Sequence, residues 1–179
     1  TASLDLPSEV VFGDETRRDE MHRKPLCVIA AIAPWNWPLL IAIWQIIPSI
    51  RAGNCVVITP SEYTSIGTLE MVRIIAELLP PGVLNSVSGP GEVGAWLVEN
   101  PAIDKVMFTG SGPTGARIAA AAARNLTPTT LELGGNDAAI VLPDADPKAM
   151  AMGLFWGAFL NMGQTCAAAK RLYVHESLH

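Results

Sequence analysis

One carboxylate and one thiol in this chain have the surroundings of a reacting pair. Glu132 stands in Leu-Glu-Leu-Gly-Gly at residues 131–135, and Cys166 follows Gly-Gln-Thr at residues 163–165. A glutamate beside two glycines, where a bound molecule can approach the backbone, is a candidate general base, and the cysteine is a candidate nucleophile. Together they predict acyl-enzyme chemistry. The alternative is that both are ordinary residues of a packed α/β domain.

A side-chain amide with few alternative positions precedes this pair in the chain. Asn36 lies in Pro-Trp-Asn-Trp-Pro at residues 34–38, where two prolines restrict the backbone and two indoles flank the amide. An amide held in one orientation is a donor suited to an oxyanion hole. The alternative is a tryptophan-rich turn in the core.

Two glycine patterns indicate nucleotide binding. The pattern G-x-G-x-x-G occurs at residues 89–94 and at residues 110–115, and each copy follows a predicted strand and opens a predicted helix. Only one copy can hold the phosphates of a single nucleotide. The second is the better candidate because Ser111 adds a hydroxyl to the helix N-terminus. Either copy can also be no more than a tight turn.

The remaining cysteines and histidines offer no convincing competing chemistry. Cys27 and Cys55 lie in apolar segments and are predicted to be small core residues. A Cys–His dyad needs a histidine in a supporting frame. The histidines lie in a charged segment, after the last predicted strand and at the terminus: His22, His175 and His179.

The composition excludes several classes of protein. The chain has 179 residues, half of them apolar and 16% charged, so it can bury a full core. A net charge of −5 gives no electrostatic footprint for a nucleic-acid partner. Three cysteines without C-x-x-C spacing argue for a reducing compartment, without disulfides or a zinc site. We therefore expect a cytoplasmic protein that holds no metal.

Two uncharged runs, residues 25–50 and 149–169, are long enough to span a bilayer. We expect the prolines of the first run to break it into short pieces, and no basic flank marks an inside end for either run. No membrane span is therefore expected. The chain begins at Thr1 without a methionine and stops soon after the strand-like residues 171–174, so we expect it to be a piece of a longer protein.

Short apolar runs alternate with amphipathic segments, which predicts an α/β fold with a doubly wound parallel sheet. The expected strands are residues 55–58, 83–87, 105–108, 130–133, 138–142 and 171–174. The expected helices are residues 65–79, 92–99, 111–124 and one from residue 147 onward, with caps from Thr64 or Ser65, Ser111 and Asp146. Before them, residues 10–12 and 26–29 flank a charged cluster and predict two strands of an exposed hairpin arm.

Five segments, taken in order, resemble motifs of the NAD(P)-dependent aldehyde dehydrogenase superfamily. They are residues 34–38, 59–62 (Thr-Pro-Ser-Glu), 108–111 (Phe-Thr-Gly-Ser), 131–135 and 163–166. The likeness runs through nearly the whole chain, and five motifs in sequence are specific where each alone is not. It implies a Rossmann-like nucleotide-binding domain followed by the start of a second α/β catalytic domain.

The resemblance also implies catalytic roles. Cys166 would attack an aldehyde to give a thiohemiacetal, and Asn36, with the backbone N–H of Cys166, would stabilise the oxyanion. Hydride transfer to the nicotinamide would leave a thioester. Water activated by Glu132 would then release the carboxylic acid.

Cofactor contacts follow from the same resemblance. Ser111 and its helix would meet the pyrophosphate, Glu62 the adenosine ribose, and the backbone of Leu133 the nicotinamide amide. The residues implied to contact the cofactor are Trp35, Thr59, Glu62, Gly110, Ser111, Gly115 and Leu133. The family usually carries lysine where Thr59 stands, so NAD is expected rather than NADP. Gln45 likewise replaces a frequent lysine.

The resemblance divides the chain into a hairpin arm of the oligomerisation type at residues 1–28, an NAD-binding domain at residues 29–132 and the truncated start of a catalytic domain at residues 133–179. It implies a homo-oligomer, dimer or tetramer, acting on a small-molecule aldehyde, with no nucleic-acid or membrane partner. The alternative is a non-catalytic nucleotide-binding or structural remnant of the same fold.

Overall fold

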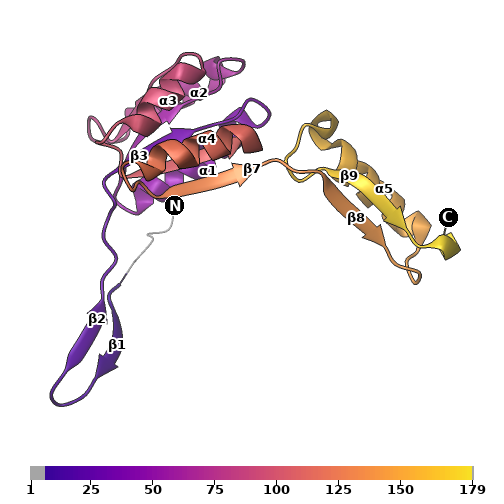
Figure 1. Cartoon of the computed structure of the whole chain (residues 1–179), viewed down its shortest axis with the longest axis horizontal. Coiled ribbons are helices and arrows are strands. Elements are labelled where there is room, and N and C mark those ends of the chain that lie inside the picture. The colour runs from indigo at the N-terminus through magenta and orange to yellow at the C-terminus, as the bar shows by residue number, and fades with distance from the viewer. Residues whose placement is uncertain (1–6, 179) are drawn as a thin grey trace.

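The structure is a computed structural model that describes residues 7–178, so residues 1–6 of the predicted arm and His179 lie outside it. Three parts follow one another along the chain (Figure 1). They are an antiparallel hairpin, a five-stranded parallel sheet between helices, and a pair of parallel strands with one long helix. The hairpin extends away from the five-stranded sheet on one side, and the pair of parallel strands lies on the opposite side of that sheet.

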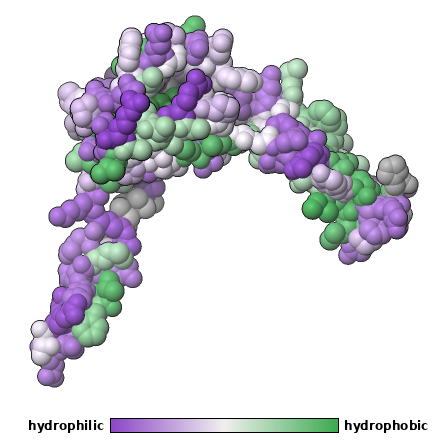
Figure 2. Space-filling model, in the orientation of Figure 1, coloured by the Kyte–Doolittle hydropathy of each residue, from purple (hydrophilic) through white to green (hydrophobic). Residues whose placement is uncertain are grey.

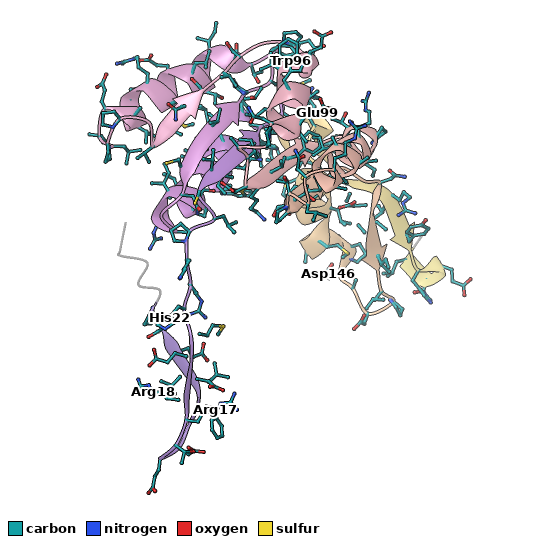
Figure 3. The ribbon with its side chains drawn as sticks, turned by 60° about the vertical axis from the view of Figure 1, so that its left-hand side comes forward. Arg17, Arg18, His22, Trp96, Glu99 and Asp146 are labelled. Carbon is teal, nitrogen blue, oxygen red and sulfur yellow. The ribbon has the colours of Figure 1, made fainter. Side chains whose placement is uncertain are left out.

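The hairpin pairs β1 (Glu9–Gly13) with β2 (Arg18–Met21). Its first strand contains the predicted residues 10–12, but the prediction that residues 26–29 form the second strand is wrong. The second strand is the charged segment itself, which can be extended because nearly all of the hairpin is exposed. Charged side chains of the arm form ion pairs with one another (Figure 3). Arg17 pairs with Asp19, and Arg18 pairs with Glu20.

The predicted doubly wound parallel sheet is confirmed, in the strand order β5-β4-β3-β6-β7. The strands are β3 (Val28–Ile32), β4 (Cys55–Thr59), β5 (Leu84–Ser86), β6 (Lys105–Gly110) and β7 (Thr129–Leu133). Continuous apolar runs suit these strands because a parallel sheet is covered on both faces. The strand order reverses between β3 and β6, which is where open α/β sheets bind their ligands.

Two helix pairs cover the two faces of the sheet. On one face, α1 (Pro38–Arg51) and α2 (Ser65–Ala76) bury Ala42, Ile46 and Val72 in one apolar core. On the other face, α3 (Gly91–Glu99) and α4 (Gly112–Ala123) bury Val98, Ile118 and Ala122 in a second core. The central strands β3 and β6 contribute side chains to both apolar cores.

The expectation that prolines break the run of residues 25–50 is wrong for its second half, because α1 is one helix of 14 residues. Pro38 stands in its first turn, where no backbone N–H is needed. Pro48 lies inside the last turns and removes one hydrogen bond, a loss of about 3 kcal/mol or more for an isolated helix. The helix persists because its buried face, from Ile41 to Ser49, packs on the sheet.

Two further local predictions need correction. Cys27 is not a core residue: it is exposed and has a φ of 112°, just before β3 begins. Asn54 holds this bend, because its Oδ1 accepts hydrogen bonds from the backbone of Leu26 at 2.6 Å and of Cys27 at 3.0 Å. Thr64 occupies the N-cap position of α2 but makes no capping hydrogen bond.

The last part pairs β8 (Asp137–Val141) with β9 (Ala169–Val174) in parallel, joined through α5 (Pro147–Phe159) and the short helix η1 (Leu160–Gly163). The short helix η2 (Glu176–Leu178) follows. Asp146 caps α5 as predicted, by accepting from the backbone of Lys148 at 2.9 Å. Apolar side chains remain exposed over this part (Figure 2). Within residues 7–178, no helix is long and apolar enough to cross a membrane.

Candidate active site

A cavity of about 880 Å³ opens at the carboxyl ends of the parallel strands, where the strand order reverses. Its wall takes Ile32 from the end of β3, Thr59 from the end of β4 and Gly110 from the end of β6. The loop of residues 163–166, which comes from the last part of the chain, forms another side. The cavity therefore joins the sheet to the segment that carries the candidate nucleophile.

Cys166 reaches this cavity because the chain reverses sharply after α5. Asn161, Met162 and Gly163 adopt left-handed backbone conformations in succession, with φ of 51°, 60° and 76°. A side chain at Gly163 would be strained by its φ and would also crowd the Ala158 carbonyl at 3.2 Å. The reversal leaves Cys166 exposed in the turn before β9, on the cavity wall.

Asn36 contacts the loop of residues 161–166, called the cysteine loop below, directly. Its Nδ2 donates to the Gln164 carbonyl at 2.7 Å, and its own carbonyl accepts from Asn161 Nδ2 at 2.9 Å. Next to it, Trp37 Nε1 donates to Thr165 Oγ1 at 3.2 Å. These three bonds join two loops that are far apart in the sequence, and they bring the amide and the thiol to the same wall.

Glu132 lines the same cavity from β7, where it stands opposite Thr109 of β6 in the strand register. Glu132 is exposed, and so are Trp35 and Glu62, which also lie on the wall. The predicted catalytic residues, which come from three different segments of the chain, thus share one cavity.

The cofactor candidates divide into two groups. Five of them line the cavity: Trp35, Thr59, Glu62, Gly110 and Ser111. Gly115 and Leu133 do not line it and instead pack together. A side chain at Gly115 would lie 2.6 Å from Leu133 Cδ2, so glycine lets the start of α4 approach β7.

The N-terminus of α4 is ordered by its cap. Ser111 Oγ accepts from the backbone of Thr114 at 3.4 Å and lies 3.0 Å from Thr114 Oγ1. Gly110 is needed before it, because a Cβ there would lie 2.5 Å from the ring of Phe108. A capped N-terminus with its dipole facing a cavity favours an anion.

The first glycine pattern also borders the cavity, which sequence reasoning had set aside. Gly91 and Gly94 of α3 line the cavity, as do Ile118 and Ala121 of α4. The sequence signal for the two glycines was the glycine pattern of residues 89–94. Thr109 and Lys170 also line the cavity and were missed as individual site residues.

Thr59 is 5% exposed, and its Oγ1 has no hydrogen-bond partner among the described residues. A buried hydroxyl without a partner on the wall of a cavity is consistent with a polar ligand that completes it. Within residues 7–178, no three histidine, cysteine or acidic side chains are grouped so that they could hold a metal ion.

Known proteins are similar to this chain in sequence and in fold. A model of the aldehyde dehydrogenase family matches residues 2–179. Phenylacetaldehyde dehydrogenase of Pseudomonas fluorescens is 45% identical over 179 residues, which cover 99% of this chain and 35% of that protein.

Two solved structures carry the same arrangement. PnpE of Pseudomonas sp. WBC-3 has a TM-score of 0.91 at 42% identity, covering 96% of this chain and 36% of its own. Lactaldehyde dehydrogenase of Escherichia coli has a TM-score of 0.92 at 36% identity, covering 96% and 37%. The chain thus spans 35% to 37% of these relatives. Because the family model covers residues 2–179, the chain belongs to the aldehyde dehydrogenase family.

Proposed function

We propose that the protein carrying this chain oxidises an aldehyde to a carboxylic acid, with a nicotinamide dinucleotide as the electron acceptor and Cys166 as the nucleophile. The observation that supports this most is the shared cavity of Cys166, Asn36 and Glu132, with the Asn36 amide bonded to the cysteine loop. A thiol, an amide donor and a carboxylate around one space are the groups that acyl-enzyme chemistry requires.

The first step is attack of Cys166 Sγ on the aldehyde carbon. The oxygen of the resulting thiohemiacetal gains negative charge, and Asn36 Nδ2 would stabilise it by exchanging its bond to the Gln164 carbonyl for one to the oxyanion. The backbone N–H of Cys166 is the second donor. Before substrate arrives, the Asn36 amide therefore stays hydrogen-bonded to the Gln164 carbonyl.

A nicotinamide dinucleotide held at this cavity would supply the hydride acceptor, and Cys166 would then carry the substrate as a thioester. Glu132 then takes a proton from water, and the hydroxide formed attacks the thioester carbon. The C–S bond breaks, the acid leaves, and the thiolate of Cys166 is restored. Glu132 implies hydrolysis rather than transfer to a thiol acceptor.

The cavity suits a dinucleotide for reasons of shape and charge. Ser111 and the α4 N-terminus would hold the pyrophosphate, and the part of the cavity lined by Gly91 and Gly94 of α3 would take the base. Glu62 would accept hydrogen bonds from the ribose hydroxyls. PnpE, at 41% identity, has been crystallised with nicotinamide adenine dinucleotide.

We propose NAD as the preferred cofactor, because Thr59 lacks the charge that would hold a 2′-phosphate and Glu62 would repel one. Trp35, which lies on the cavity wall, would also contact the cofactor. The chain would serve as an oligomerisation arm at residues 1–28, an NAD-binding domain at residues 29–132 and the start of a catalytic domain at residues 133–179. A cytoplasmic homo-oligomer, dimer or tetramer, fits these assignments.

The test is aldehyde-dependent formation of NADH by the full-length protein and by its Cys166→Ala variant. We expect turnover in the former, none in the latter, and equal binding of NAD by both. NAD binding without turnover in the wild-type protein would instead support a non-catalytic role. Cys27→Ala is the matched control, because this exposed thiol does not line the cavity.

A further inference from the structure

Gln45 is a buried polar residue for which the proposed mechanism has no use. It lies on α1, is 4% exposed and faces the sheet. Its Nε2 is 3.3 Å from the carbonyl oxygen of Ile32 and 3.4 Å from Thr109 Oγ1. Its Oε1 is also buried and has no hydrogen-bond partner among the described residues. A buried acceptor without a partner is unfavourable and calls for an explanation.

The two neighbours of Gln45 fix the orientation of its amide. The Ile32 carbonyl can only accept a hydrogen bond, so Nε2 and not Oε1 must face it. The second hydrogen of Nε2 then points to Thr109 Oγ1, which accepts it. A hydroxyl that accepts from this side has its own proton free to point elsewhere. Thr109 therefore becomes a donor, and its side chain lies on the cavity wall.

Thr109 is the direct neighbour of Glu132. The two residues are opposite each other in the parallel pairing of β6 with β7, and residues opposite in a parallel pair present their side chains to the same face. Both line the cavity. The hydroxyl proton that Gln45 directs away from itself is therefore available on the side of the sheet where the Glu132 side chain stands.

We infer that Gln45 and Thr109 are positioning residues for Glu132: the Gln45 amide keeps the Thr109 hydroxyl as a donor, and that donor holds the Glu132 carboxylate toward the thioester. This inference rests on the proposed function. The inferred role concerns only the hydrolysis step, in which Glu132 acts. Asn36 serves the earlier attack step and is hydrogen-bonded to the Gln164 carbonyl, not to Thr109.

Matched variants distinguish the positioning role of Gln45 and Thr109 from ordinary packing of α1 on the sheet. Gln45→Met keeps the size of the side chain and removes both the donor and the unpartnered acceptor, so folding is expected to be retained. Thr109→Val keeps the shape and removes the hydroxyl, whereas Thr109→Ser keeps the hydroxyl. Ser49→Ala is the control, because Ser49 is buried in the same interface and bonds Gln45 O and Met107 Sδ without lining the cavity.

The experiment measures NADH formation by the full-length protein in a rapid-mixing instrument, with aldehyde and NAD in excess. For Gln45→Met and Thr109→Val we expect a burst of about one NADH per Cys166 at the wild-type rate, followed by turnover that is roughly tenfold slower, because only the proton transfer from water has lost its positioning. Ser49→Ala should turn over like the wild-type protein, and Thr109→Ser should recover most of the turnover that Thr109→Val loses.

Two results would overturn the inference. Wild-type turnover in both Gln45→Met and Thr109→Val removes the pair from the mechanism. A slower burst in either variant assigns it to attack or hydride transfer instead of hydrolysis. A wild-type protein that forms no NADH at all contradicts the proposed function itself, which is a separate outcome of the same measurement. Thermal unfolding of each variant identifies any that fails to fold, and Thr109→Val leaves α1 unaltered.

Discussion

A single hydrogen bond holds the side chain of Asn36. Its Nδ2 donates to the Gln164 carbonyl oxygen at 2.7 Å, so the amide lies at the loop that carries the proposed nucleophile. The bond is made to a carbonyl, which an oxyanion can replace as the acceptor. Truncation of the Asn36 side chain is therefore expected to have little effect on cofactor binding.

We therefore predict that Asn36→Ala lowers kcat by about two to three orders of magnitude, since one oxyanion donor contributes roughly 3–4 kcal/mol. The dissociation constant of NAD should stay near its wild-type value. Steady-state kinetics and fluorescence titration measure the two quantities. The control is Asn85→Ala, which removes a similar amide-to-carbonyl bond of 2.7 Å to Gly82, away from the cavity. Equal kcat in both variants excludes Asn36 from catalysis.

Gly110→Ala should destabilise the fold by about 1–3 kcal/mol, as overpacking of a core does. The new Cβ would lie 2.5 Å from the buried ring of Phe108, which has little room to move. Gly157→Ala is the matched control, because nothing lies within 4 Å of its Cβ and alanine favours a helix by about 0.5–1 kcal/mol. Chemical denaturation should therefore give opposite signs for the two variants, and a stable Gly110→Ala would show the crowding to be relieved.

At the scale of elements, much of the sheet could be predicted from the sequence. Short apolar runs locate β4 and β6, because both faces of a parallel strand are buried. The helix α1 could not be predicted from its prolines, since packing of its buried face outweighs one missing hydrogen bond. Charge could not exclude β2, because an exposed strand has no core face to keep apolar.

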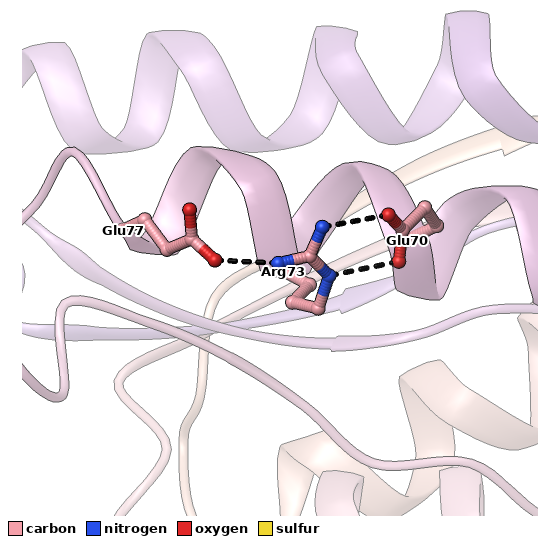
Figure 4. Close-up of polar contacts among 3 residues, drawn as sticks. All are labelled: Glu70, Arg73 and Glu77. Atoms are coloured by element: carbon pink, nitrogen blue, oxygen red, sulfur yellow. Dashed lines mark hydrogen bonds and ion pairs between the residues drawn. The ribbon is translucent and has the colours of Figure 1, made fainter.

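The outer face of α2 carries its own ion network, in which Arg73 bonds Glu70 on one side and Glu77 on the other (Figure 4). The side-chain hydrogen bond from Arg73 lowers the pKa of Glu70. A carboxyl whose pKa is depressed on folding contributes stability above its ordinary pKa and loses it as the pH falls through the depressed value. The network should therefore favour the helix at neutral pH and not in acid.

We predict that Arg73→Met raises the pKa of Glu70 to its ordinary range, while the unfolding temperature changes little because the group is fully exposed. Carboxyl titration by NMR measures the shift. Arg124→Met, which removes an exposed partner 3.8 Å from Glu99 on the other face of the sheet, should leave Glu70 unaffected. A Glu70 that titrates alike with and without Arg73 contradicts this assignment.

At the scale of the whole molecule, the cavity exists only because three distant segments meet at the end of the sheet. The sequence motifs and their resemblance to a family indicate Asn36, Glu132 and Cys166, yet no local pattern predicts the bonds of Asn36 to the loop of residues 161–164. The contact of Gln45 with Thr109 could not be predicted from the sequence either, because it joins a helix and a strand that are far apart in the chain.

The proposed oligomerisation role of the hairpin can be tested at its exposed apolar residues. Val11 is 66% exposed, in a strand whose only partner within the described residues is β2. We predict that Val11→Asp in the full-length protein lowers its mass in light scattering to that of a smaller assembly, while Val11→Thr, which keeps the β-branched shape, leaves the mass unchanged. An unaltered mass for Val11→Asp rejects an oligomerisation role for this strand.

In the proposed reaction, the reacting carbon becomes bonded to Cys166 before water releases it. The direct measurement is mass spectrometry of acid-quenched Glu132→Gln protein after incubation with aldehyde and NAD. Loss of the base should let one acyl group accumulate, and peptide mapping should locate it on Cys166. NADH formation without an acyl group on the protein, or an acyl group on Cys27 or Cys55, would contradict the account.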